Sequence, residues 1–164
     1  MLKFRMIVML VGLLILIVTG CNREVTMDEQ TAEAYVQAQG YKVLKHKGQI
    51  TAYTLEKKTL ESNPYQQSWS VQKHEPDPYF GKEVTVYGFT VANHPLEQIY
   101  PSKTNVSIML CEGKVIGGNS FPENNGKMIR VGAPYSLDGK TLEEVTGMTY
   151  IEWTAYWKQK YGSN

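Results

Sequence analysis

Most of the signatures that mark an enzyme or a nucleic-acid-binding protein are absent from this chain of 164 residues. It has only two cysteines and no Cys-x-x-Cys pair, which excludes zinc-ribbon and thioredoxin-like sites. Its 17 Lys and Arg side chains nearly balance its 16 Asp and Glu side chains. The basic excess typical of proteins that bind nucleic acid or acidic lipid is therefore missing. No glycine-rich phosphate loop and no nucleophile elbow is present. We expect no cofactor and no nucleic-acid partner.

The composition is that of a folded protein, with 42% hydrophobic and 20% charged residues. Aromatic side chains are its most distinctive component, and they include 11 Tyr and 3 Trp. Tyr and Trp are common in cores and are also favoured at binding surfaces, because each combines a large apolar area with a polar tip. The sequence leaves both interpretations open.

The one long hydrophobic run lies at the N-terminus. Lys3 and Arg5 precede an apolar stretch from Met6 to Val18, which is interrupted only by Gly12. This stretch is shorter than the roughly 20 residues that a transmembrane helix needs. A basic start, a short apolar run and small residues at its end are typical of a secretory signal.

The segment Val18-Thr19-Gly20-Cys21 ends this signal. It resembles the lipobox of bacterial lipoproteins, with Val18 at a position that usually holds Leu. The resemblance implies cleavage between Gly20 and Cys21 and attachment of a diacylglyceryl group to the Cys21 sulfur. Residues 1–20 would then be a lipoprotein signal peptide, and residues 21–26 a lipidated N-terminus and short tether on the extracytoplasmic face of the cell membrane. The alternative is an uncleaved signal anchor with an incidental cysteine.

The tether has a physical consequence. Two acyl chains hold a protein stably on a bilayer, whereas one chain binds only marginally. Six extended residues reach roughly 20 Å. The folded part would therefore sit close to the lipid headgroups.

Residues 27–164 have the pattern of a single α+β domain. Helical spacing and capping signals predict helices over residues 27–39, 141–146 and 149–161. Apolar patterning predicts strands over residues 41–47, 49–55, 65–71, 83–92, 105–111, 114–121 and 127–131. Most connections are too short for parallel crossovers. We expect an antiparallel sheet of about five to seven strands, with the N-terminal helix and the C-terminal helices packed on it.

Two features within the predicted strands have a structural interpretation. Cys111 ends an apolar strand and is expected to be buried, the alternative being a reactive thiol. Gly117-Gly118 lies inside another strand, where two glycines indicate a bulge or a tight bend.

One cluster of candidate metal ligands stands out. His74, Glu75 and Asp77 lie within a loop stiffened by two prolines, and His94 is a candidate neighbour of this loop in the fold. Zinc needs three or four such ligands converging at about 2.0–2.3 Å. The alternative interpretation is a solvated polar loop.

Three functions remain open. The first is a non-enzymatic lipoprotein whose domain binds or regulates a membrane-proximal protein or an envelope polymer. The second is a surface-located metal-dependent or hydrolytic enzyme that uses the loop of His74, Glu75 and Asp77. The third is a lipoprotein that binds a small ligand. The short tether, the aromatic content and the missing catalytic motifs favour the first.

Overall fold

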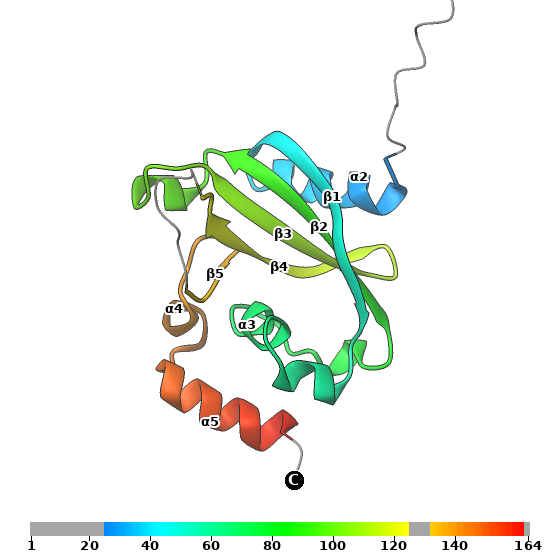
Figure 1. The fold of residues 1–164 in the computed structure, drawn as a ribbon, viewed down its shortest axis with the longest axis vertical. Coiled ribbons are helices and arrows are strands. Elements are labelled where there is room, and N and C mark those ends of the chain that lie inside the picture. The colour runs from blue at the N-terminus through cyan, green and yellow to red at the C-terminus, as the bar shows by residue number, and fades with distance from the viewer. Residues whose placement is uncertain (1–24, 125–131, 163–164) are drawn as a thin grey trace, which may run out of the picture.

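The computed structural model describes residues 25–124 and 132–162 and has an α+β fold (Figure 1). The predicted signal peptide, the Gly20–Cys21 cleavage site, the lipidated Cys21 and the predicted strand over residues 127–131 lie outside these residues. Within the described part, no helix combines the length and the hydropathy needed to cross a membrane.

The centre of the fold is an antiparallel meander in which each strand lies beside its neighbours in sequence. This confirms the predicted antiparallel sheet. The described sheet has five strands in the order β1-β2-β3-β4-β5, with the bounds β1 Lys42–Thr54, β2 Glu83–Ala92, β3 Thr104–Cys111, β4 Lys114–Pro122 and β5 Tyr135–Ser136. Strand β2, which was predicted as an inner strand from apolar residues on both faces, lies between β1 and β3, and nearly all of its residues are buried.

Strand β1 corrects the prediction of two strands joined at Lys47-Gly48. Residues 42–54 form one strand that pairs with β2 over its whole length, from Lys42 opposite Ala92 to Thr54 opposite Glu83. Gly48 does have a positive φ of 73°, but it lies at one of three register shifts in this pairing. The glycine therefore accommodates a bulge instead of reversing the chain.

The N-terminal helix α2, Met27–Ala38, covers one face of the sheet and confirms the predicted helix over 27–39 (Figure 1). It begins where the Thr26 hydroxyl accepts a hydrogen bond from the Glu29 N–H. Helix and sheet share a buried cluster, which includes Ala32, Val36, Tyr41, Tyr87, Phe89, Val91, Val106, Ile108 and Leu110.

Short helices and the C-terminal helix lie on the opposite side of the sheet, where α5 packs against η2. Their bounds are η2 Lys57–Glu61, α3 Tyr65–Trp69, η3 Asp77–Tyr79, α4 Leu142–Thr146 and α5 Tyr150–Tyr161. A further short helix, η4 Pro95–Gln98, contacts β4. The core on this side includes Leu55, Leu60, Trp69, Val71, Val84, Val86, Met109, Cys111, Ile116, Leu142, Trp153, Trp157 and Tyr161. In Figure 1, α5 lies at the end of the molecule opposite to α2.

Helix α3 corrects the predicted strand over residues 65–71. Ser68 N–H donates to Pro64 O and Ser70 N–H donates to Gln66 O, which are helical hydrogen bonds. The segment has no partner strand in the described sheet. Seven residues of alternating polarity fit a short helix that buries Trp69 as well as they fit a strand, so periodicity over so short a run does not discriminate.

Helices α4 and α5 begin and end as the sequence predicts. Thr141 and Thr149 each form a complete capping box with the glutamate three residues later. Gly147 ends α4 with a φ of 71°. Trp153, Trp157 and Tyr161 of α5 pack into the core, whereas Tyr150 at the start of the helix is exposed. Trp157 also donates its indole N–H to Leu60 O at 3.0 Å.

Candidate functional site

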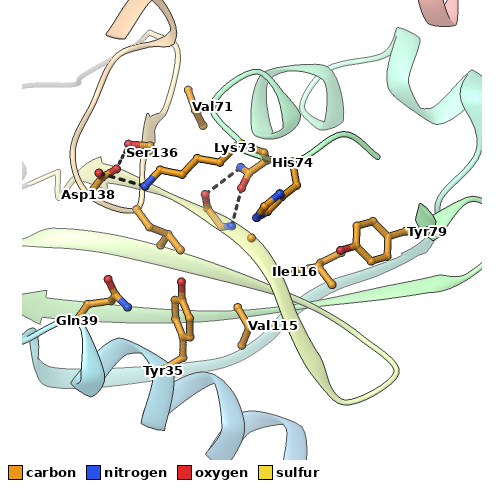
Figure 2. A pocket seen from close by; sticks show the side chains of 14 residues that line it. Tyr35, Gln39, Val71, Lys73, His74, Tyr79, Val115, Ile116, Ser136 and Asp138 are labelled. Carbon is orange, nitrogen blue, oxygen red and sulfur yellow. Dashed lines mark hydrogen bonds and ion pairs between the residues drawn. The ribbon is translucent and has the colours of Figure 1, made fainter. Parts of the chain in front are cut away.

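An open cavity of about 280 Å³ lies between helix α2, the edge of strand β4, the segment 71–74 and the loop 136–138. We call it the α2–β4 pocket (Figure 2). It brings together residues from four distant parts of the chain: Tyr35, Gln39, Val71, Gln72, Lys73, His74, Tyr79, Val115, Ile116, Gly117, Gly118, Ser136, Leu137 and Asp138.

The carboxamide of Gln72 forms part of the pocket wall. Gly118 N–H donates to Gln72 Oε1 at 2.9 Å, and Gln72 Nε2 donates to Gly118 O at 2.9 Å. Nε2 also donates to Ser68 O, which connects the end of α3 to β4. The amide thus satisfies both main-chain groups of Gly118, as a neighbouring strand would.

The Gly117-Gly118 pair makes this approach feasible. A Cβ atom at Gly117 would lie 2.3 Å from Gln72 Oε1, and one at Gly118 would lie 2.3 Å from Ser107 O. The predicted bulge adjoins this pair, because Met109 faces Gly117 whereas Leu110 faces Val115. The two glycines therefore mark a close approach as well as an irregularity of the strand.

Polar contacts hold the loop 136–138 in place. Ser120 donates its hydroxyl proton to Ser136 O at 2.7 Å, and Ser136 donates to Asp138 Oδ1 at 2.6 Å. Asp138 Oδ2 lies 3.7 Å from Lys73 Nζ and 3.2 Å from Lys140 Nζ. Partial burial opposes ionisation of Asp138, but the hydrogen bonds from Ser136 and Lys140 outweigh it and lower the pKa.

The Leu137 carbonyl receives two hydrogen bonds from buried rings. Tyr41 donates its hydroxyl proton at 2.9 Å, and His94 Nε2 lies 3.0 Å from the same oxygen. Leu96 N–H donates to His94 Nδ1, so Nδ1 is an acceptor and the proton of the neutral ring is on Nε2. Burial lowers the pKa of His94. His94 has a structural role here and does not join His74.

The three predicted metal ligands are not brought together as a site. His74 lines the α2–β4 pocket, whereas Glu75 and Asp77 both lie within hydrogen-bond distance of the Tyr161 hydroxyl and share its single proton. In residues 25–124 and 132–162, no three His, Cys, Asp or Glu side chains are grouped so that they could hold a metal ion. Two of the candidates instead connect the loop to the end of helix α5.

The electrostatics of this connection are clear. Tyr156 donates to Glu75 Oε1 at 2.8 Å, and Lys160 Nζ lies 3.1 Å from Glu75 Oε2. Partial burial raises the pKa of Glu75, but hydrogen bonds from Tyr161, Tyr156 and Lys160 outweigh it and lower the pKa. The Tyr161 hydrogen bond also lowers the pKa of Asp77. Burial and the two carboxylates raise the pKa of the Tyr161 hydroxyl.

The Cys111 thiol, whose alternative interpretation was a reactive nucleophile, is unsuited to that role. Cys111 is 4% exposed, which confirms the expected burial, and this burial raises the pKa of its thiol. A buried thiol with a raised pKa yields little thiolate, which is the reactive form.

Sequence reasoning missed most of the pocket. Tyr35, Gln39, Gln72, Lys73 and Asp138 belong to no motif. Two local signals fell on the pocket. His74, predicted as a metal ligand, lines it, and the glycine pair indicated an irregularity without naming Gln72 as the group that approaches it.

Comparison with known proteins gives no relative from which function could be transferred. No protein-family model matches the chain, and neither the curated proteins nor the solved structures include a significant match.

Proposed function

We propose that this protein is a lipid-anchored extracytoplasmic binding protein that uses the α2–β4 pocket to hold a membrane-proximal envelope component. The observation that carries the proposal is the pocket itself, an open cavity with main-chain edges, aromatic rings and amides on its walls. Concave sites with a few fixed polar groups among apolar ones are typical of ligand recognition.

The rigidity of the pocket supports a binding role. Gln72 fixes one wall to Gly118, and Tyr41 and His94 fix the opposite loop through the Leu137 carbonyl. Walls held by such contacts lose little conformational freedom when a partner binds, which favours affinity.

The size of the pocket favours part of a larger partner over a small molecule. Its volume of about 280 Å³ is slightly below the range of roughly 300–1,000 Å³ that is typical of small-molecule sites. The cavity is also open to solvent. A segment of a protein or polymer could enter it while the rest of that partner stays outside.

The proposed anchor limits where the partner can be. Tyr35 follows Met27 by eight positions in α2, about 12 Å at a rise of 1.5 Å per residue. The tether from Cys21 adds roughly 20 Å. The pocket would then lie within about 30 Å of the lipid headgroups, so its partner must be accessible there.

The anchor is tested by a Cys21→Ser variant with labelled palmitate. We expect label in the parent protein, and neither label nor stable membrane association in the variant. Equal labelling and membrane retention of both proteins would refute lipidation at Cys21.

The pocket is tested in cells by a photoreactive phenylalanine analogue placed at position 35. The matched control carries the analogue at Tyr150, which is 59% exposed at the other end of the molecule. We expect a discrete cross-linked envelope component from position 35 only, reduced at least fivefold by Lys73→Glu. Identical products from both positions, or none from position 35, would overturn the binding role of this pocket.

A further inference from the structure

We infer that the α2–β4 pocket receives an extended peptide segment of a partner protein, which adds as a strand to the free edge of β4. This inference rests on the proposed binding function and names the chemistry of the partner. In strand addition, main-chain hydrogen bonds supply affinity, and the pockets that receive alternate side chains supply specificity.

The edge of β4 that faces the pocket lacks a neighbouring strand over part of its length. Strand β5 pairs with β4 only at Asn119 and Ser120. Within the described residues, no strand pairs with the outer edge of residues 115–117. These same residues line the cavity, so their outward-facing main-chain groups are next to the space that a partner would fill.

Gln72 shows how an amide binds to this edge. Its carboxamide presents an N–H and a C=O on the same side, and it makes with Gly118 the two contacts that the N–H and C=O of one residue in an antiparallel neighbour strand would make. Gln72 therefore takes the place of the one residue of an added strand that would face Gly118. The positions beside it, toward residue 115, continue along the open cavity.

The side walls suit the alternating side chains of an extended peptide. Figure 2 shows Tyr35 and Gln39 on the α2 side of β4, with His74 and Tyr79 on the opposite side. Because successive side chains of a strand point to opposite faces, residues of an added peptide would contact these two walls in turn. One wall offers a phenol and an amide, and the other offers an imidazole and a phenol.

The charges of the pocket do not favour an anionic or cationic polymer. Lys73 lies 3.7 Å from Asp138, which is itself 3.2 Å from Lys140. Cation and carboxylate are thus already paired. The free main-chain edge favours a peptide, because an extended polypeptide presents donors and acceptors at the spacing of a neighbouring strand.

The experiment uses the full-length lipid-anchored protein in nanodiscs and a displayed library of random decapeptides as the probe. The tightest peptide is synthesised and then methylated on one backbone nitrogen at a time. Backbone N–H groups of a strand alternate in direction, so only every second one faces the partner strand. We expect at least tenfold weaker binding after methylation at alternate positions and less than a twofold change at the intervening ones.

Two variants and one spectroscopic readout locate the peptide. Tyr35→Ser should weaken its binding at least fivefold, whereas the matched surface control Tyr150→Ser should leave it unchanged. Amide hydrogen exchange within residues 115–117 should slow at least tenfold when the peptide is bound.

The outcomes separate this inference from the proposed function. Uniform effects of methylation, unchanged exchange at residues 115–117, or the absence of any binding peptide would each overturn strand addition. If position 35 then cross-links to a polysaccharide, the binding function stands with a different partner. If position 35 also cross-links to nothing, both proposals fail.

Discussion

The carboxamide of Gln72 and the main chain of Gly118 pair as two adjacent strands do, with both hydrogen bonds at 2.9 Å. The two residues are 46 positions apart, and their pairing connects the segment after α3 to the edge of the sheet. Both residues also line the α2–β4 pocket. The Gln72 side chain therefore contributes both to the connection between these segments and to the wall of the candidate site.

Replacing Gln72 should destabilise the protein in a pH-dependent way. Gln72→Leu leaves both main-chain groups of Gly118 without this partner, at a cost of about 1–3 kcal/mol. Gln72→Glu keeps an acceptor for Gly118 N–H but places a carboxylate against the carbonyls of Gly118 and Ser68. The loss in free energy of unfolding caused by Gln72→Glu should become smaller as the pH falls and the new carboxyl group is protonated. Denaturant unfolding followed by tryptophan fluorescence at pH 5 and pH 8 measures this loss for each variant. The same pH dependence for Gln72→Leu and Gln72→Glu would contradict the pairing of Gln72 with Gly118.

Adding a methyl group at the glycine pair should cost more at Gly118 than at Gly117. A Cβ at Gly118 meets the main-chain oxygen of Ser107, which cannot move without shifting β3. A Cβ at Gly117 meets chiefly the flexible end of Gln72. We expect about 2–3 kcal/mol for Gly118→Ala and about 1 kcal/mol for Gly117→Ala, in free energy of unfolding. The reverse order would show that Gln72, and not the β3 backbone, is the rigid neighbour.

Acid should destabilise the native state through His94. Burial lowers its pKa below that of a histidine in the unfolded chain, which is about 6.5. As the pH falls below about 6.5, the unfolded state gains a proton that the native state does not, so stability decreases until the native pKa is reached. Above that window neither state binds the proton, and this contribution is constant.

The variant His94→Asn isolates this effect. Asn keeps an oxygen that can accept the Leu96 N–H at the start of η4. It lacks a titrating ring, so the slope of stability against pH between about 5 and 6.5 should be smaller than in the parent. Denaturant unfolding at four pH values measures the two slopes, and equal slopes would assign the acid sensitivity to other groups.

Removing the Tyr161 hydroxyl should weaken the contact between helix α5 and the loop at residues 75–77. Tyr161→Phe should lower the free energy of unfolding by about 1–2 kcal/mol at pH 7, since both carboxylates are about half exposed and their hydrogen bonds are partly screened. Because these bonds lower the pKa values of Glu75 and Asp77, their stabilisation is present above the unfolded values of about 4 and is lost as the pH falls through the native ones.

Tyr156→Phe is the matched control, because it removes one hydrogen bond to Glu75 and none to Asp77. Its effect should be smaller, and the difference between the two variants should shrink as the pH falls below the unfolded values of about 4. A constant difference from pH 7 to pH 3 would show that packing, and not the carboxylates, accounts for the loss.

Thiol counting reports on both cysteines. The denatured mature protein should have one reactive thiol per chain, because Cys21 would be a thioether and only Cys111 would react. The native protein should react far more slowly, since Cys111 is 4% exposed. Ellman's reagent with and without denaturant measures both. Two thiols per denatured chain would contradict acylation of Cys21.

The elements that could be predicted from sequence are those whose cause is local. Helix α2 begins at a Thr26 hydroxyl that caps its own first turn, and α5 begins at the capping box of Thr149. The β3–β4 hairpin turns at Glu112 and Gly113, both with positive φ. Each of these signals involves groups only a few positions apart, so it can be predicted from the sequence alone.

The wrong predictions of secondary structure concern segments whose local pattern fits two structures. Gly48 suits a turn or a bulge, and its pairing with Gly88 across the sheet decided for a bulge. Alternating residues 65–71 suit a strand or a short helix, and burial of Trp69 among α5 and η2 residues decided for the helix. Contacts with residues that are distant in the sequence select between the two structures. A window of seven residues contains no information about those contacts.

The sequence by itself determined the α+β class, the antiparallel order of the sheet and the ends of its main helices, because these follow from periodicity, short connections and capping. Only the tertiary structure decided which residues form the candidate site. Gln72 forms hydrogen bonds with Gly118, which is 46 positions away in the sequence, and the Tyr161 hydroxyl donates to Glu75, which is 86 positions away. Such contacts arise when packing of the two sheet faces brings distant segments together, and no spacing along the chain encodes them.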